Sequence, residues 1–228
     1  MATKRFVLDL ISGIYLDFTT LYMILPGLIN FVLIQIHLYL NSFRCLVDFS
    51  EPEEGHEFCR YMQDITHRLD RLPIPVITYI NGVAYGGGSE LSTIGDVILA
   101  APNAKVCWVH KKMALQPGWG GASRLVNLVG RRNAAHLQMT SRVSSSEDLL
   151  KIGYVQEIVE DIDQWIEKNI SEIPPSVLQA MKSNIINSSL DLEGEGFYLK
   201  ESNVFKSLYG APENKAAIEN VIKSIKKS

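Results

Sequence analysis

The sequence predicts an α/β domain followed by a helical region, and two patterns support this fold class. Between residues 53 and 159, short apolar runs typical of buried strands alternate with segments of helical spacing. From residue 161 onward only helical spacing remains. Because strands that alternate with helices imply crossover units, we expect an α/β core over residues 44–160 and a helical region over residues 161–228.

The elements of the core follow one another in a regular order. A first helix is expected over residues 53–71, where apolar side chains recur at steps of three and four until Pro73 ends the pattern. A buried strand should follow at residues 76–80, and then a helix that begins near residues 87–89 and carries Leu91 and Ile94 inward. Further strands are expected at residues 97–100, 106–109 and 155–159, with helical spacing at residues 121–129 and 132–140 and a capping signal at residues 144–147.

The C-terminal region contains four stretches of helical spacing. Two of them begin at a proline. Proline suits the first position of a helix, because the backbone N–H that it lacks has no hydrogen-bond partner within the helix at that position. The expected helices cover residues 162–173, 175–186, 195–208 and 212–225.

The N-terminal segment, residues 1–43, is the least regular part of the chain. Residues 21–40 are overwhelmingly apolar and long enough to cross a bilayer, although Pro26, Asn30 and Gln35 interrupt the run. The alternatives are a membrane anchor, a buried core segment, and a segment that does not belong to the fold. A membrane contact is therefore expected only through residues 21–40.

Composition excludes some classes of function. The 228 residues are 46% hydrophobic, and the net charge of −3 with scattered basic residues leaves no broad surface for nucleic acid. Three widely spaced cysteines without a nearby histidine cluster suit reduced thiols in a reducing compartment, and no metal site is expected. Few early arginines together with Asp9 and Asp17 are unlike a mitochondrial presequence, so a cytosolic location is expected.

The turn at residues 81–91, with the sequence NGVAYGGGSEL, is the strongest candidate for a functional site. Consecutive glycines let the backbone approach a ligand closely, and the helix start that follows offers unpaired N–H donors. Such a turn can hold a negatively charged oxygen.

Two motifs carry a resemblance to a known family. The run GGGSE at residues 86–90 and the run PGWGG at residues 117–121, followed by Arg124 and Leu125, resemble the crotonase (enoyl-CoA hydratase/isomerase) superfamily, from about Arg44 to the C-terminus. The resemblance implies a spiral of ββα units with a C-terminal helical cap and an acyl-CoA thioester as substrate. It also implies a homotrimer or homohexamer, and no cofactor, since coenzyme A is part of the substrate.

The resemblance also implies roles for individual residues. The family places one backbone oxyanion donor three residues before the glutamate of the glycine motif, which assigns Gly87 N–H to an enolate oxygen and makes Glu90 a catalytic candidate. Gly86 and Gly88 flank that donor as substrate-binding candidates. Trp119 and Gly120 of the second motif join them, Trp119 as an apolar wall.

Hydratases of this superfamily have a second glutamate seven residues before the proline of the second motif, and this chain has His110 there. The departure counts against water addition, which needs both a base and an acid. The block VHK at residues 109–111 instead resembles the branch that decarboxylates ethylmalonyl-CoA and methylmalonyl-CoA, a lyase activity that removes wrongly carboxylated acyl-CoAs in fatty acid metabolism. His110 could orient the leaving carboxylate or supply a proton, because imidazole changes charge near neutral pH.

Two alternatives remain open beside the decarboxylase. One is an enoyl-CoA hydratase or isomerase that uses Glu90 as its sole acid/base group. The other is a catalytically impaired relative that binds acyl-CoA or partner subunits, motivated by the N-terminal part. There the family's other oxyanion motif should fall near residues 40–42, but these read LNS rather than Gly-x-Asp, and the opening strands and helix of the fold are not recognisable, so the first layers of the spiral are expected to be replaced. Lys111, Lys112 and Arg124 are expected to be solvated surface charges, with CoA phosphates as the alternative partner.

Overall fold

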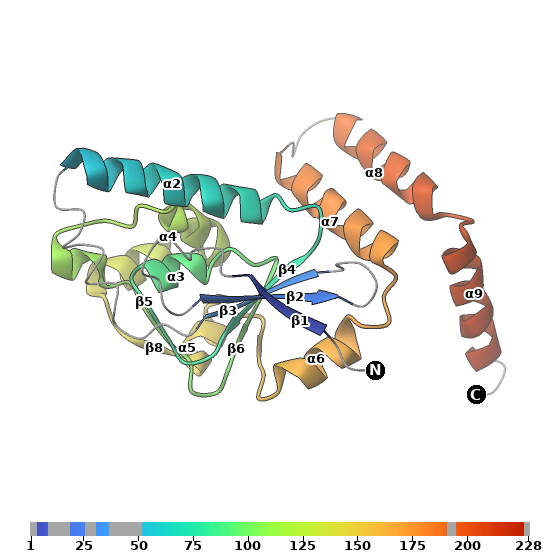
Figure 1. The fold of residues 1–228 in the computed structure, drawn as a ribbon, viewed down its shortest axis with the longest axis horizontal. Coiled ribbons are helices and arrows are strands. Elements are labelled where there is room, and N and C mark those ends of the chain that lie inside the picture. The colour runs from blue at the N-terminus through green and yellow to red at the C-terminus, as the bar shows by residue number, and fades with distance from the viewer. Residues whose placement is uncertain (1–3, 9–18, 26–30, 37–51, 191–194, 226–228) are drawn as a thin grey trace. The chain divides into compact units, whose positions relative to one another are not determined.

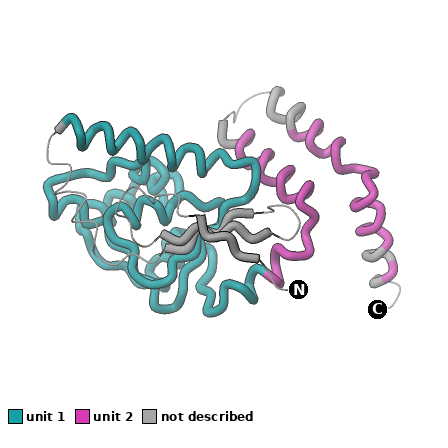
Figure 2. Tube along the Cα trace, viewed as in Figure 1, with its two compact units in different colours: residues 1–166 teal, residues 167–228 magenta. Residues whose placement is uncertain are grey.

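The computed structural model describes residues 4–8, 19–25, 31–36, 52–190 and 195–225 (Figure 1). Strands and helices alternate in the first part of the chain and helices alone follow, which confirms the predicted α/β class. The chain divides into two compact units, Met1–Ile166 and Glu167–Ser228 (Figure 2). The candidate site lies in the first unit, and the second unit is purely helical in its described part.

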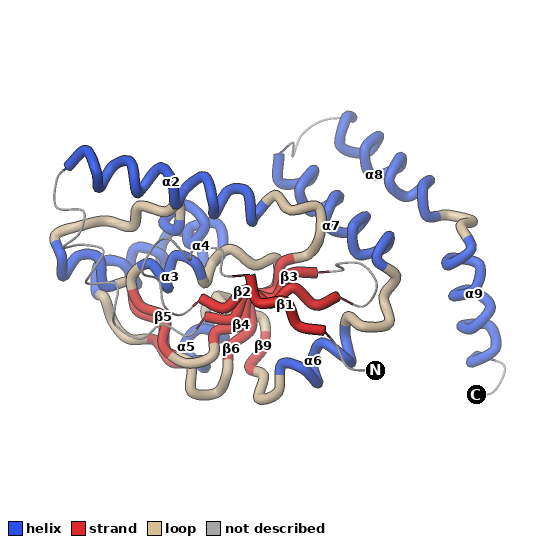
Figure 3. Tube along the Cα trace, in the orientation of Figure 1, coloured by secondary structure: helices blue, strands red, loops and turns tan. Residues whose placement is uncertain are grey.

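The main sheet of the first unit is mixed (Figure 3). Its order is β1-β2-β3-β4-β6-β9; the first three strands pair antiparallel, and every pairing from β3 to β9 is parallel. Helices must intervene between parallel strands, as the alternation in the sequence predicts. The strands are β1 Lys4–Leu8, β2 Thr19–Leu25, β3 Phe31–Ile36, β4 Val76–Ile80, β6 Val97–Ala100 and β9 Glu157–Ile158.

The N-terminal strands correct one expectation. Residues 1–43 were expected to lack the opening strands, but β3 pairs with β4 in register from Val32 opposite Val76 to Ile36 opposite Ile80. The strands escape sequence analysis because β2 and β3 read TTLYMIL and FVLIQI, nearly continuous apolar runs without the alternation that identifies a half-buried strand. Within the described ranges, no helix is long and apolar enough to cross a bilayer, and the described parts of residues 21–40 lie in β2 and β3.

A second, smaller sheet has the order β5-β7-β8, made of β5 Val83–Tyr85, β7 Lys105–Cys107 and β8 Ser144–Ser145. The sequence did not predict β5, because a run of three residues carries too little periodicity. The strand expected at residues 106–109 ends at Cys107, and a 3₁₀ helix, η1 Val109–Met113, follows. His110 therefore lies in a helical turn and not at a strand end.

The helices of the first unit agree closely with the prediction. α2 Pro52–Asp70, α3 Gly87–Leu91 and α4 Gly121–Thr140 begin where the patterns indicate. Gly130 divides α4 with φ 74° and ψ 160°, which explains why its sequence reads as two helical segments. α5 Ser146–Lys151 starts with the predicted cap: Asp148 N donates to Ser145 Oγ at 3.2 Å, and Ser145 N donates to the Asp148 side chain.

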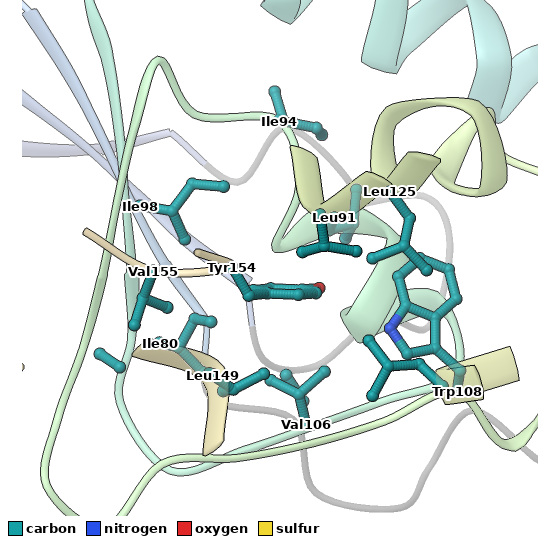
Figure 4. Packing of buried hydrophobic residues seen from close by; sticks show 14 of the residues in the cluster. Ile80, Leu91, Ile94, Ile98, Val106, Trp108, Leu125, Leu149, Tyr154 and Val155 are labelled. Carbon is teal, nitrogen blue, oxygen red and sulfur yellow. The ribbon is translucent and has the colours of Figure 1, made fainter. Parts of the chain in front are cut away.

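Apolar side chains from both sheets and from the helices share one core. Tyr154 lies in its centre among Ile80, Leu91 and Leu149, and its hydroxyl points toward the side occupied by Trp108 (Figure 4). Leu91 and Ile94 are buried as predicted. Through Leu91, the helix α3 that follows the glycine turn therefore packs against this core.

The chain continues with α6 Ile162–Asn169, which spans the boundary between the units, and the second unit then contains α7 Pro175–Leu190, α8 Glu195–Leu208 and α9 Pro212–Ile225. Each corresponds to one of the predicted helices, and the sharp starts at Pro175 and Pro212 follow from proline at the first helical position.

Candidate functional site

The glycine turn connects β5 to α3 in a tightly bonded conformation. Gly86 has φ 56° and ψ −121°, a backbone conformation that requires glycine. Its N–H donates to Cys107 O at 3.2 Å, and its carbonyl accepts from Ser89 Oγ at 2.6 Å and from Glu90 N at 3.2 Å. The turn therefore fixes the direction in which Gly87 N–H points.

The amide of Gly87 is the first N–H of α3. Within the described ranges it donates to no protein acceptor, so it can donate to a ligand. The indole of Trp119 packs directly against this glycine: a Cβ added at residue 87 would lie 2.2 Å from Trp119 Cζ3. Phe58 of α2 supports the indole in an edge contact, with ring centroids 5.7 Å apart. The two motifs thus meet as the sequence predicts.

A single buried carboxylate joins these two motifs. Glu90 is 1% exposed, and its Oε2 accepts from Trp119 N at 2.7 Å and from Gly121 N at 3.0 Å. Its Oε1 lies 3.1 Å from the donor Gly118 N and 3.2 Å from His110 Nε2. Three backbone N–H groups therefore donate to one carboxyl group, and both of its oxygens act as acceptors.

The loop at residues 118–121 is also held through its carbonyl groups. From α2, Cys59 Sγ and Gln63 Nε2 donate to Gly118 O at 2.9 Å and 2.7 Å. Thr66 Oγ1 donates to Trp119 O at 3.0 Å. Burial raises the pKa of the Cys59 thiol, so this group stays a neutral donor. Backbone groups on both sides of the loop are therefore bonded, which fixes the backbone that carries the indole.

Arg124 corrects the expectation of a solvated charge. Its Nε donates to Thr93 Oγ1 at 3.0 Å, and its Nη2 donates to Trp119 O at 2.9 Å and to Glu90 O at 3.4 Å. Burial lowers the pKa of Arg124, against the opposing effect of the Glu90 charge. Lys111 and Lys112 are exposed, as expected, and Lys111 Nζ donates to Met139 O at 2.6 Å. Arg124 thus stabilises the site from within, a role that its place in a helical pattern did not reveal.

His110 is buried and joins the site through one ring nitrogen. Nε2 faces Glu90, whereas Nδ1 is buried without a hydrogen-bond partner in the described part of the chain. The ring centroids of Trp108 and His110 lie 6.0 Å apart. The imidazole is thus close to the glutamate of the glycine motif, as its place in the sequence predicts.

A buried polar network that sequence reasoning missed supports α3. The hydroxyl of Tyr154 lies 2.6 Å from Ser92 Oγ and donates to Ser89 O at 3.1 Å. Burial raises the pKa of the Tyr154 phenol, which therefore remains a neutral donor. A tyrosine far along the chain gives no local signal of this contact, since the two partners are brought together only by the fold.

The remaining predicted site residues have different outcomes. Gly88 is buried in α3, and Gly120, with φ 78°, precedes the first residue of α4. Residues 40–42, where the family's other oxyanion motif was expected, lie outside the described residues. The structure therefore gathers the predicted catalytic and binding residues around one turn and one loop: Gly86, Gly87, Gly88, Glu90, His110, Trp119 and Gly120.

Comparison with known proteins identifies the family. The family model described as enoyl-CoA hydratase/isomerase matches residues 49–220. The chain belongs to this family. It is 35% identical to ethylmalonyl-CoA decarboxylase from Gallus gallus over 78% of this chain and 61% of that protein. The identity to the Homo sapiens protein of the same name is 33%, over 78% of this chain and 60% of that protein.

The chain thus spans about three fifths of the length of these relatives. Among solved structures, it is similar to an enoyl-CoA hydratase from Thermoplasma volcanium, with a TM-score of 0.69 at 26% identity, covering 84% of this chain and 93% of that one. An enoyl-CoA hydratase from Bacillus anthracis has a TM-score of 0.72 at 20% identity, covering 91% of this chain and 97% of that one. These structures establish a crotonase fold for this family member.

Proposed function

We propose that this chain is an acyl-CoA carboxy-lyase that decarboxylates ethylmalonyl-CoA or methylmalonyl-CoA. One observation carries the proposal: the position that holds a second glutamate in hydratases is His110, and its imidazole lies 3.2 Å from the carboxylate of Glu90. Water addition needs two acid/base groups, whereas decarboxylation needs an acceptor for charge and a proton donor. The similarity to ethylmalonyl-CoA decarboxylases supports the same choice.

The chemistry follows from the groups in place. The bond between the α-carbon and the substrate carboxylate breaks, carbon dioxide leaves, and the electron pair forms an enolate on the thioester. The enolate oxygen accepts from Gly87 N–H, which has no protein acceptor in the described ranges. A backbone donor of this type contributes roughly 2.7–4 kcal/mol in a protease oxyanion hole.

Desolvation and protonation complete the reaction. Trp119 provides an apolar wall against Gly87, which disfavours the charged carboxylate of the substrate relative to the neutral carbon dioxide that leaves. The proton that ends on the α-carbon comes from His110, whose Nε2 lies 3.2 Å from Glu90 Oε1. Gly86, Gly88 and Gly120 keep side chains away from the bound thioester.

The family also supports assembly as a homotrimer or homohexamer, which sedimentation equilibrium would measure.

The test compares two reactions with the purified full chain. Ethylmalonyl-CoA should yield butyryl-CoA and carbon dioxide in equal amounts, with little hydration of crotonyl-CoA. Efficient hydration without carbon dioxide release would favour the second candidate, an enoyl-CoA hydratase or isomerase, which the names of the similar solved structures support. Acyl-CoA binding without either reaction would indicate a catalytically impaired family member.

A further inference from the structure

The hydrogen bonds of Glu90 are unusual for a group that exchanges a proton with substrate. Both carboxylate oxygens already have two partners each, and the side chain is 2% exposed. A general acid or base must reach the substrate atom at hydrogen-bond distance, directly or through one water. To do so, Glu90 would have to give up one of these four contacts, which are made by three backbone N–H groups and by His110.

We propose that Glu90 is a positioning residue, whose carboxylate holds the backbone at residues 118–121 and thereby keeps the Trp119 indole against Gly87. The inference deepens the proposed function and rests on it for the identity of the reaction. It gives the glutamate of the glycine motif a role different from that of a proton donor or acceptor.

The packing around Glu90 fits this role. A Cβ at Gly121 would lie 2.6 Å from both Cβ and Cγ of Glu90, so the loop approaches the side chain as closely as a glycine permits. The shortest of the four contacts, 2.7 Å, is made by the amide of Trp119 itself. The carbonyl of the same residue is held by Thr66 and Arg124. Both peptide groups of Trp119 are thus fixed, and its indole has a defined place.

A carboxylate is required because every fixed partner is a donor. In Glu90→Gln one oxygen becomes an NH₂ group, which would face backbone N–H groups instead of accepting from them. The loop must then shift or leave donors unpaired. Since misplacing a contact by 1 Å can cost about 100-fold in rate, a displaced indole explains a loss of turnover without any proton transfer by Glu90.

The experiment follows the indole directly. Trp119 emission is obtained from the full chain by subtracting the spectrum of Trp119→Phe, which retains Trp108 and Trp165. We expect Glu90→Gln to shift this emission to longer wavelength, raise KM, and lower kcat/KM for ethylmalonyl-CoA by about 100-fold. The pH–rate profile should keep both limbs. Glu147→Gln, which replaces an exposed carboxylate with an amide in the same way, is the matched control and should leave emission and turnover unchanged.

A second variant tests the same loop without touching the carboxylate. Thr66→Val removes the bond to Trp119 O, and it should shift the emission in the same direction with a smaller loss of kcat/KM. If Glu90→Gln does not fold, this variant decides: emission that shifts together with kcat/KM supports the proposal, and a shift without loss of turnover overturns it. Loss of one limb of the pH–rate profile in Glu90→Gln, with Trp119 emission unchanged, would also overturn it. Absence of decarboxylation by the wild type would refute the proposed function instead, while the emission spectra, which need no substrate, would still test the role of Glu90.

Discussion

The indole of Trp119 occupies the space in which a side chain at Gly87 would begin. The nearest ring atom would lie 2.2 Å from a Cβ, although Gly87 lacks the positive φ of Gly86 and Gly120. Glycine is therefore required at residue 87 by close approach and not by backbone conformation. The same contact places an apolar ring beside the Gly87 amide that the proposed reaction uses.

Gly87→Ala should accordingly force the indole away and lower both stability and activity. Overpacking of this kind typically costs about 1–3 kcal/mol, measured here as a change in the free energy of unfolding in urea. In a Trp119→Ala background the same substitution should cost much less, because the clashing atoms are gone. Equal costs in the two backgrounds would show that the indole does not limit residue 87.

Trp119 should also control which thioesters react. Trp119→Ala removes the apolar wall, so we expect kcat/KM to fall for ethylmalonyl-CoA and the preference between ethylmalonyl-CoA and methylmalonyl-CoA to change. One methylene in an apolar pocket is worth about 10–200-fold in discrimination. Competition between the two substrates, followed by the ratio of their products, measures the effect. Leu115→Ala, which truncates an exposed apolar side chain outside the glycine motifs, should leave the ratio unchanged.

Most helices and strands of the core could be predicted, because each has a pattern of apolar residues that is visible in consecutive positions of the sequence. The helix α2 and the strand β4 match their predicted ranges almost residue for residue, since amphipathic spacing and a buried apolar run are properties of consecutive residues. The break in α4 at Gly130 was also visible as two segments. The strands β1 to β3 were missed because their apolar runs lack alternation.

The roles of the site residues depended on contacts between distant segments. The sequence indicated that Glu90 and His110 belong to one site, and the structure brings them to 3.2 Å. The sequence could not show that backbone N–H groups of the second motif donate to the Glu90 carboxylate, because every residue except proline has such a group. Arg124 was expected in solvent for a similar reason, since its acceptors are carbonyls and a threonine from elsewhere in the chain.

Arg124→Lys tests whether the guanidinium holds the loop. Lysine keeps the positive charge but cannot reproduce the fixed donor geometry that bonds Thr93 and Trp119 O together. We expect a loss of about 1–3 kcal/mol in the free energy of unfolding, because each of these part-buried acceptors loses one donor. Arg131→Lys, on the exposed side of α4, is the matched control and should change stability by less than about 0.5 kcal/mol. Similar small losses in both variants would contradict a structural role for Arg124.

Tyr154→Phe should loosen α3 without creating a cavity. The substitution removes only the hydroxyl, so Ser92 Oγ loses a 2.6 Å contact and Ser89 O loses a donor in a buried setting. The expected cost is about 1–3 kcal/mol in the free energy of unfolding. Tyr61→Phe, which removes a hydroxyl from a side chain that is 51% exposed, should be nearly neutral. An unchanged urea midpoint in Tyr154→Phe would indicate that water or another group replaces the hydroxyl.

Acid should remove a contribution of the α5 cap. A hydrogen bond from Arg142, at 2.6 Å, and one from the backbone of Ser145 hold the pKa of Asp148 below its ordinary value. Because the folded pKa is lower than the unfolded one, the carboxylate stabilises the fold above about pH 4, and this contribution is lost as the pH falls through the folded pKa. The side chains are 42% and 45% exposed, so solvent screening limits the effect to about 1 kcal/mol.

Urea unfolding of wild type and Asp148→Asn at neutral pH and near pH 3 measures this contribution. The stability difference between the two proteins should be largest at neutral pH and shrink in acid, since protonated Asp148 resembles the asparagine in charge. Arg142→Gln should retain part of the pH dependence, because the bond from the backbone of Ser145 remains. A difference that stays constant between the two pH values would mean that the Asp148 charge does not stabilise the cap.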